Sequence, residues 1–345
     1  MLKTRRILTG FCTLLCFAVS ARAEVPGKDE LISLYAKSLD LVQKATLTSE
    51  SNTMEIEPRA GERQNEFTRF TFYRDGERLA STGFQRITLE SGQIKEINNP
   101  TWIIDKRAML VLSKPDARES VHVLPAKDMS MAKAKVGAGL VAGQMTRGVL
   151  HGMTVDLTAI LRAPDANVTV RREMEEVDGH QTYVLEYQGK EGRIIFWLDP
   201  NAAYHPRRLT VHKSGDDLFE GVPLTTFRFQ IPGLEGKKLK EVTEVFDSLK
   251  IENVNGVFMI TGGKMTYTEL FDDGHKTSVV CVFRFFDIDL NPNFDVSKPF
   301  DLKVPDGTPV NDADFPGGSF EVRQGKIVSA GTPFEQIDKA IDGIK

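Results

Sequence analysis

The stretch from residue 177 to residue 213 constrains the fold of this chain more than any other. It contains three runs rich in Tyr, Val, Ile, Phe, Trp and Thr, the residue types that suit a pleated surface. The runs are residues 181–187, 193–198 and 207–211. Turn-forming residues separate them, with Gly189 and Gly192 in the first gap and Asp199-Pro200 in the second. The pattern predicts an antiparallel three-stranded meander.

A five-residue turn between the first two runs would pair Tyr187 with Arg193. Alternation along the strands then places four apolar side chains on one face, as candidates for an apolar-ligand cavity: Tyr183, Leu185, Ile195 and Trp197. The other face of the second run is also apolar, so the sheet should be covered on both sides. Both covers could be ordinary protein core, or one could be a ligand. The sequence leaves open which face forms the cavity.

The first 23 residues have the features of a secretory signal peptide. A basic segment containing Lys3, Arg5 and Arg6 precedes an apolar run over residues 7–19, and Ala21-Arg22-Ala23 matches a small-x-small cleavage site. No later stretch approaches the roughly 20 apolar residues that a membrane-spanning helix needs. We therefore expect cleavage between Ala23 and Glu24, no transmembrane segment, and a periplasmic or secreted protein.

Charge and cysteine content narrow the classes of partner and the source of stability. The full sequence carries 44 basic and 48 acidic residues. Cleavage would remove four basic residues and no acidic one, leaving a formal charge of −8 on the mature chain. An acidic chain disfavours nucleic acid as the main partner. Cys281 is the one cysteine beyond the signal peptide, so an internal disulfide is excluded and stability must come from the core.

The rest of the chain predicts a mainly β fold. Residues 29–45 carry apolar side chains at helical spacing, and from residue 46 the period changes to two. The expected strands outside the meander cover residues 46–57, 66–74, 79–88, 93–97, 101–112, 219–229, 242–251, 256–270 and 277–290. Hairpin turns are expected at Asp75-Gly76, Asn255-Gly256 and Asp273-Gly274. Because no repeat or low-complexity segment marks a boundary, residues 24–328 are expected to form one antiparallel sheet domain.

Residues 128–162 interrupt the strand pattern with clustered methionines and glycines. They predict a flexible helical insertion in the sheet domain. Since methionine adapts to irregular apolar surfaces, one interpretation is a helical lid over an apolar ligand, formed by Met145, Met153 and Leu157. The alternative is a mobile connection that ends in a short amphipathic helix. Residues 329–345 are expected to form a C-terminal tail or a short helix.

Motifs for metals, cofactors and catalysis fail on their spacing. Gly137, Gly139 and Gly143 are one residue too far apart for a dinucleotide-binding loop. The segment that begins at Asp287 lacks the glycine and the glutamate of a calcium loop. The six histidines are scattered, and the sequence contains no nucleophile elbow or phosphate loop. We therefore expect a non-catalytic protein with no cofactor and no metal, while its many carboxylates leave a glycosidase pair open.

Two segments carry a resemblance to a known family. Together with the leading helix and the long meander, Gly192-Arg-Ile-Ile-Phe-Trp-Leu-Asp-Pro200 and Pro206-Arg-Arg-Leu-Thr-Val211 resemble the LolA/LolB-like superfamily of periplasmic lipoprotein carriers. The block from Asp289 to Val310 resembles the tails of uncharacterised exported members. The resemblance implies a half-open β-barrel whose concave, apolar side is covered by helices. It transfers no ligand-contacting residue, because no motif of the carriers' binding site is matched.

The expected function is binding of an acyl chain, a lipoprotein or another apolar ligand in the concavity of the half-open barrel. Such binding needs apolar area and no titrating residue. Transient contact with an envelope membrane would accompany it. Two alternatives use the same fold: an envelope interaction or sensor module that binds a partner by sheet-edge addition, and an envelope hydrolase.

Overall fold

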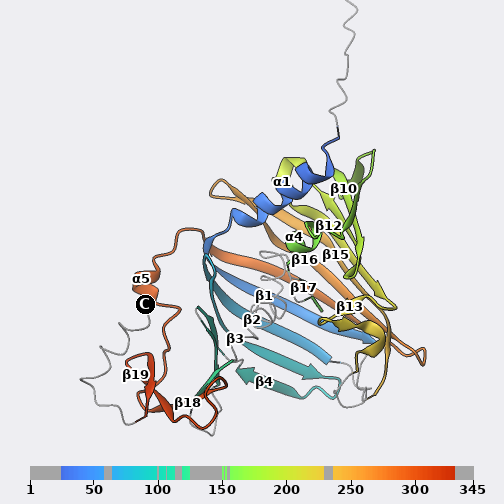
Figure 1. The fold of residues 1–345 in the computed structure, drawn as a ribbon. Helices are drawn as coiled ribbons and strands as arrows, with labels where there is room; N and C mark the ends of the chain where they lie inside the picture. Colours follow the sequence, from blue (N-terminus) through green and yellow to red (C-terminus); the bar gives the residue numbers. More distant parts are fainter. Residues whose placement is uncertain are drawn as a thin grey trace, which may run out of the picture.

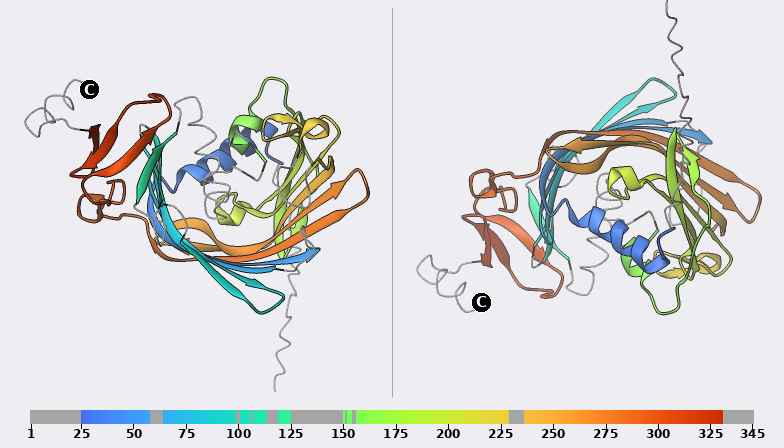
Figure 2. Two further views of the ribbon diagram at one scale, coloured as in Figure 1. Left: turned by 90° about the horizontal axis from the view of Figure 1, so that it is seen from below. Right: turned by 90° about the horizontal axis from the view of Figure 1, so that it is seen from above.

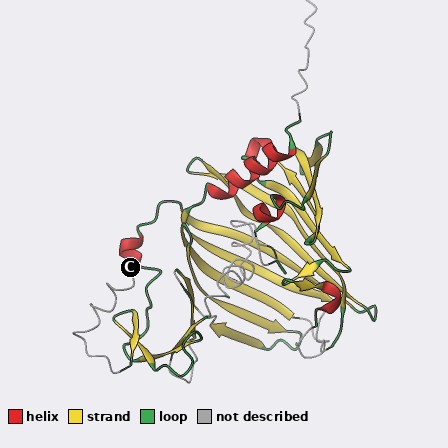
Figure 3. Cartoon of the chain, viewed as in Figure 1, coloured by secondary structure: helices red, strands yellow, loops and turns green. Residues whose placement is uncertain are grey.

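The computed structural model of the 345-residue chain describes residues 25–57, 64–98, 101–105, 107–112, 119–124, 150, 152–153, 156–228 and 236–330. Within these residues, most strands join one large curved sheet, and helices α1 (Lys28–Asp40) and α4 (Leu157–Leu161) lie on its concave side (Figures 1, 2 and 3). The described strands do not close into a barrel. The expected mainly β, half-open architecture with helices on the concave side is confirmed.

The described part of the sheet contains eighteen strands. In chain order they are β1 (Lys44–Glu57), β2 (Gln64–Asp75), β3 (Arg78–Leu89), β4 (Ile94–Asn98), β5 (Thr101–Ile104), β6 (Ala108–Leu112), β7 (Ser120–Val123), β8 (Asn167–Val170), β9 (Glu175–Val177), β10 (His180–Gly189), β11 (Gly192–Leu198), β12 (Pro206–Ser214), β15 (Leu239–Val254), β16 (Val257–Phe271), β17 (Lys276–Asp289), β18 (Thr308–Asp312), β19 (Phe320–Arg323) and β20 (Lys326–Ser329).

Neighbouring strands do not follow the chain order. From one end the sheet runs through β8 and β9, then β10, β11, β12, β15, β16, β17, β1, β2 and β3. β4 and β5 both pair with β3, and the sheet continues from β5 through β6, β7, β18, β19 and β20. The pair β7–β18 is parallel. The expectation of a purely antiparallel sheet is therefore wrong at this one junction, where the chain returns to an edge from far along the sequence.

The sequence of α1 explains why these residues form a helix and not a strand. Asp29 and Glu30 lie in its first turn and Lys37 in its last, the arrangement that the helix dipole favours. Its buried residues recur at helical spacing, and they include Leu31, Tyr35 and Leu39. The ring of Tyr35 lies 5.3 Å from that of Phe196 on β11. The helix is therefore held on the concave side by aromatic and aliphatic packing.

The predicted hairpin turns are confirmed. Asn255 and Gly256, between β15 and β16, have φ values of 52° and 89°, the left-handed conformation that these residue types tolerate. Gly76 and Gly274 also have positive φ in the turns that follow β2 and β16. Turn chemistry alone therefore located three of the connections in this sheet.

In its described part, residues 219–228, the strand expected over residues 219–229 is not formed. This segment instead contains part of a separate hairpin of β13 (Leu218–Phe219) and β14 (Val222–Pro223), followed by the 3-10 helix η3 (Leu224–Thr226). Glu220 and Gly221 both have positive φ, which turns the chain back after two residues. Phe219 and Leu224 pack in a small core under the end of β15 and β16. These two apolar side chains therefore fill a small core beside β15 and β16 and do not belong to a further strand of the sheet.

A C-terminal unit packs on the opposite side of the sheet. It comprises α5 (Phe294–Ser297) and β18–β20, and it lies beside β5–β7 in Figures 1 and 2. Phe294, Phe300 and Leu302 share a core with Ile103 and Val121. The convex side of this end of the sheet is thus buried by the chain itself.

Several expectations fall outside the described residues. They include the signal peptide, most of the helical insertion over residues 128–162, and the segment beyond residue 330. No helix in the described ranges combines the length and apolar character that crossing a membrane requires.

Candidate functional site

The two sides of the sheet are called the inner and outer faces. The inner face is the concave side that carries α1 and α4. On β17, Cys281, Phe283 and Phe285 belong to the same core as α1, whereas Val282 and Arg284 are exposed on the outer face. Paired residues on neighbouring strands lie on the same face, and successive residues of one strand alternate between the faces.

The register of the meander differs from the predicted one. Gly189 pairs with Gly192, so the turn between β10 and β11 holds two residues and not five. Gly192 adopts a φ of 91°, which allows the tighter turn. The partner of Leu185 becomes Phe196, because a slip of one residue exchanges the faces of one strand relative to the other.

The four cavity candidates therefore divide between the two faces. Tyr183 and Leu185 lie on the inner face, and Ile195 and Trp197 lie on the outer face. The expectation that the four share one face is wrong. Tyr183 and Leu185 are buried in the core beneath α1, and the ring of Tyr183 stacks on that of Tyr204 at 6.4 Å.

Trp197 is buried on the outer face by polar groups. Its indole Nε1 donates to Oε2 of Glu175 at 2.8 Å, and the guanidinium of Arg208 lies 5.2 Å from the ring centre. The bond from Trp197, with help from Arg171, lowers the pKa of the Glu175 carboxyl. Trp197 thus has protein partners on the outer face, and contact with a ligand there stays a prediction.

Two of the three lid candidates pack in the core of the inner face. Met153 and Leu157 are buried there, while Met145 lies outside the described residues. Helix α4 begins after Asp156, whose side chain accepts a hydrogen bond from the backbone N–H of Ala159 at 2.8 Å. The described part of the insertion therefore packs against the inner face of the sheet.

The inner face of β1–β3 has a different lining from that beneath α1. Ser51 and Thr68 join their hydroxyl groups across β1 and β2 at 2.6 Å. Phe70 on β2 and Trp102 on β5 lie at the edge of the core and remain partly exposed. Burial raises the pKa of the Glu66 carboxyl on the same face. This region combines partly exposed aromatic rings with a pair of hydroxyls that are hydrogen-bonded to each other.

A buried ion pair stands at the other end of the inner face. Nζ of Lys213 lies 3.2 Å from Oε2 of Glu191 and donates to the backbone carbonyl of Leu218 at 2.6 Å. Burial lowers the pKa of Lys213, although Glu191 opposes that effect. The pair fixes the β13–β14 hairpin on the sheet and holds the tight β10–β11 turn in place.

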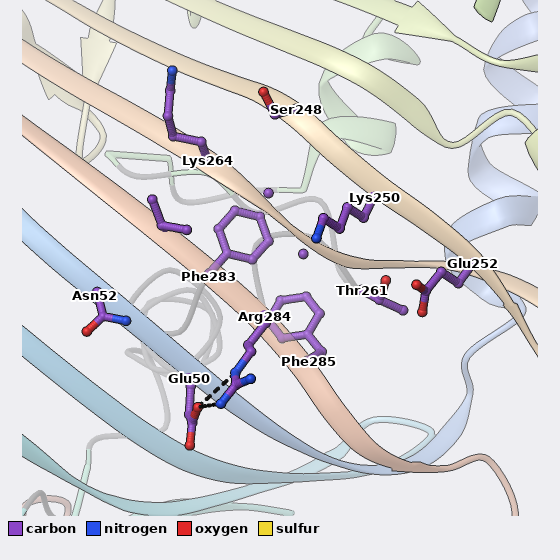
Figure 4. Close-up of a pocket in the computed structure, with 13 residues that line it drawn as sticks. Glu50, Asn52, Ser248, Lys250, Glu252, Thr261, Lys264, Phe283, Arg284 and Phe285 are labelled. Carbon is purple, nitrogen blue, oxygen red and sulfur yellow. Dashed lines mark hydrogen bonds and ion pairs between the residues drawn. The ribbon is translucent and has the colours of Figure 1, made fainter. Parts of the chain in front are cut away.

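The described residues also form a pocket of about 510 Å³ on the outer face (Figure 4). It lies where register shifts in β15 and β16 kink the two strands, beside Gly262 and Gly263. A side chain at Gly263 would come within 2.6 Å of Leu249. The missing side chains thus permit the kink beside which the pocket forms.

Charged side chains surround this pocket. Nε of Arg284 donates to Oε2 of Glu50 at 2.9 Å, and Lys264 lies 3.3 Å from Asp247. Lys250 also lines the pocket. This pocket was not predicted from the sequence. Two adjacent glycines inside an expected strand were the available signal, because glycine in a strand often marks a bulge.

Metal binding finds no support in this part of the chain. No group of three or more His, Cys, Asp or Glu side chains is arranged to hold an ion among the described residues. His205 is buried and shares a hydrogen bond with the carbonyl of Phe258 at 2.8 Å. It supports the turn between β11 and β12.

Comparisons with known proteins give limited similarity. No family model and no curated protein matches the chain. Among solved structures, a DUF1329 family protein from Desulfovibrio piger is 11% identical, with 77% of this chain and 95% of that chain covered and a TM-score of 0.39. Lipovitellin, in a structure concerned with its lipid–protein interactions, is 9% identical over 73% of this chain and 26% of its own, with a TM-score of 0.33.

LprF from Mycobacterium bovis is 8% identical, with 78% of this chain and 97% of that chain covered and a TM-score of 0.28. None of the three carries the LolA or LolB name. Identities and scores this low give no residue-by-residue correspondence.

Proposed function

We propose that the protein binds an acyl chain or another apolar ligand on the inner face of its open sheet, without catalysing a reaction. The observation that carries this proposal is the partial exposure of Phe70 and Trp102 beside the inner core. Covering about 100 Å² of such surface contributes about 2.5 kcal/mol before the cost of ordering the ligand. A ligand that covers both rings would gain correspondingly more.

The polar groups beside these rings are compatible with an apolar cover. Ser51 and Thr68 already bond to each other, so an apolar ligand that covers them loses less hydrogen bonding than it would over two unpartnered hydroxyls. Glu66 lies on the same face with a raised pKa. Its neutral form costs less to cover than a carboxylate does. An acyl chain therefore fits this lining better than a highly charged ligand.

The two tryptophans of the chain allow a direct test, because they lie on opposite faces. In a Trp197→Phe variant, the emission of Trp102 should shift to shorter wavelength when a monomeric fatty acid is added, since the ligand replaces water at the ring. In a Trp102→Phe variant, the emission of Trp197 should stay unchanged. A shift at Trp197 alone would move the ligand site to the outer face, and no shift at either residue would refute ligand binding.

A second measurement uses two phenylalanines on opposite faces of β2. Phe70→Ala should weaken fatty-acid binding by roughly 1–3 kcal/mol, the scale of one large apolar contact. Phe67, which pairs with Asn52 and Arg86 on the outer face, is the matched control. Phe67→Ala should bind fatty acid like the parent protein. Equal losses in both variants would indicate an effect on folding and not on the site.

The cellular location of the protein and the identity of its ligand are part of the same proposal. We propose that residues 1–23 direct export and that the mature protein begins at Glu24 in the periplasm or outside the cell. Intact-mass measurement of the exported protein tests this, and a retained N-terminus would contradict it. Native mass spectrometry would show whether the acyl chain belongs to a free lipid or to a lipoprotein.

A further inference from the structure

Exposed aliphatic side chains lie on the outer face of β1 and β4. Met54 on β1 pairs with Val280, and the polar residues Asn65 and Thr88 separate it from Ile94 on β4 in the same row. Met54 and Ile94 are 52% and 61% exposed. Large apolar side chains gathered on one exposed sheet face mark a contact surface more often than scattered ones do.

The next row along the strands adds to the same surface. Val282, which is 53% exposed, pairs with Asn52, and Asn52 pairs with Phe67. Val282 and Asn52 also line the pocket of about 510 Å³. The row that contains Val282 therefore borders the pocket directly.

Arginines stack on aromatic rings beside these rows. The guanidinium groups of Arg69 and Arg284 lie 5.5 and 5.1 Å from the ring centre of Phe286, and that of Arg86 lies 6.0 Å from Phe84. Arginine next to aromatic and aliphatic side chains is typical of protein surfaces that meet lipid headgroups. The outer face thus has both an apolar and a cationic component.

The charges of this surface nearly balance, because Arg86 pairs with Glu96 at 3.2 Å and Lys264 with Asp247 at 3.3 Å. Glu50 accepts from Arg284 and lies 3.6 Å from Arg69, so one carboxylate serves two arginines. Lys250 makes no ion pair or hydrogen bond within the described ranges, and exposed Glu252 offsets one charge. The full chain has a formal net charge of −4. Five basic and four acidic side chains leave this surface with one net positive charge although the chain as a whole is acidic, and this difference favours an anionic partner over a cationic one.

We propose that this outer face docks on an anionic lipid bilayer, with a lipid phosphate in the pocket beside Lys250 and with Met54, Val282 and Ile94 in the headgroup region. Aliphatic side chains that enter the interface and basic side chains beside anionic lipids both favour such docking. The docking face is distinct from the proposed acyl-binding face, so each can be tested while the other is unchanged.

Cosedimentation with vesicles tests the proposal on the full exported chain. The protein should bind phosphatidylcholine vesicles that contain about 30% phosphatidylglycerol and should bind pure phosphatidylcholine vesicles much more weakly. Replacing Met54→Ser and Val282→Ser together should lower the vesicle partition at least about tenfold. Lys250→Ala should lower it about fivefold. Val296→Ser is the matched control, because Val296 is 79% exposed on α5, which packs beside Tyr73 at the end of β2 that lies opposite to Met54.

Three results would overturn the docking proposal. The protein could fail to bind either kind of vesicle, it could bind them in a way that the outer-face variants leave unchanged, or it could form a dimer that the Met54→Ser and Val282→Ser double variant makes monomeric. The last result would assign the face to a second copy of the chain. Binding of monomeric fatty acid by the same variants reports on the inner face, so failure of one proposal is distinguishable from failure of the other.

Discussion

The inner and outer faces of the sheet are made by the same strands, yet their side chains differ in how far they are buried and in what they contact. On β17, Phe283 packs beneath the helices, and its neighbour Val282 is 53% exposed to solvent. On β11, Phe196 is fully buried against α1, and Trp197 is covered by polar groups. Both faces are rich in apolar residues. The difference between them comes from what packs on each side and not from composition.

Charged groups show the same contrast. Lys213 and Glu191 are buried on the inner face, where each requires the other. Arg284 and Glu50 form their pair on the outer face, where solvent screens them and the pair contributes little to stability. A single substitution should therefore have very different effects on the two faces.

The largest expected effect is a loss of stability that differs between two neighbouring residues of β11, one packed on the inner face and one on the outer face. Phe196→Ala should lower the free energy of unfolding by about 3–5 kcal/mol, because it leaves a cavity under α1. Ile195→Val on the outer face should cost less than about 1 kcal/mol, since Ile195 is partly exposed. Urea unfolding of both variants measures the difference. Equal losses would show that the outer face is packed as tightly as the inner one.

The next-largest expected effect compares the loss of stability when a buried carboxylate or an exposed one is removed. Glu191→Ala should destabilise the protein by about 3 kcal/mol, because Lys213 keeps a buried charge without its partner. Glu252→Ala, at an exposed position beside the outer pocket, should stay within about 0.5 kcal/mol of the parent. Substituting Glu191→Leu and Lys213→Met together should recover much of the loss, and no recovery would argue against charge burial as its cause.

A third effect is pH dependence from a buried histidine. Burial lowers the pKa of His205 from 6.5 to about 4. The unfolded chain therefore takes up this proton first as pH falls, so the contribution to stability is complete above about pH 6.5 and is lost towards pH 4. At about 1.4 kcal/mol per pKa unit, the loss reaches about 3 kcal/mol.

Unfolding measured at several pH values checks this expectation. His205→Gln should flatten the decline between about pH 6.5 and pH 4. The control is His212→Gln, because His212 is exposed on the outer face, where its ring lies 3.2 Å from Glu241. A profile that His205→Gln leaves unchanged would assign the acid sensitivity to carboxylates instead.

A smaller effect is expected from the proposed docking surface itself. Val282→Ser should change the free energy of unfolding by less than about 0.5 kcal/mol, because solvent already reaches this side chain. Thermal and urea unfolding would both check this. A loss of several kcal/mol would mean that Val282 is structural, and it would weaken the proposal that this face is free to meet a membrane.

No effect is expected from reductant. Cys281 is buried on the inner face, and burial raises the pKa of its thiol. The melting temperature should therefore be the same with and without dithiothreitol, and iodoacetamide should label the thiol only after unfolding. Rapid labelling of the folded protein would show that solvent reaches the inner face at this point.

Local sequence patterns predicted much of the architecture. Alternating apolar residues located the long strands, and Asn255-Gly256 and Asp273-Gly274 located hairpin turns, because left-handed backbone favours these residue types. The helical spacing that begins near Leu31 located α1. Each of these signals acts within a few residues, so the sequence alone was sufficient to read them.

The candidate site depended on the register between β10 and β11, which the sequence did not determine. Gly189 and Gly192 are compatible with turns of two or five residues, and the choice depends on contacts made elsewhere, including that of Glu191 with Lys213. A slip of one residue moved Trp197 from the face of Tyr183 to the opposite one. The sequence by itself determined the strands, the turns and the leading helix. Tertiary packing decided which side of each strand is buried, because burial depends on residues that are distant along the chain.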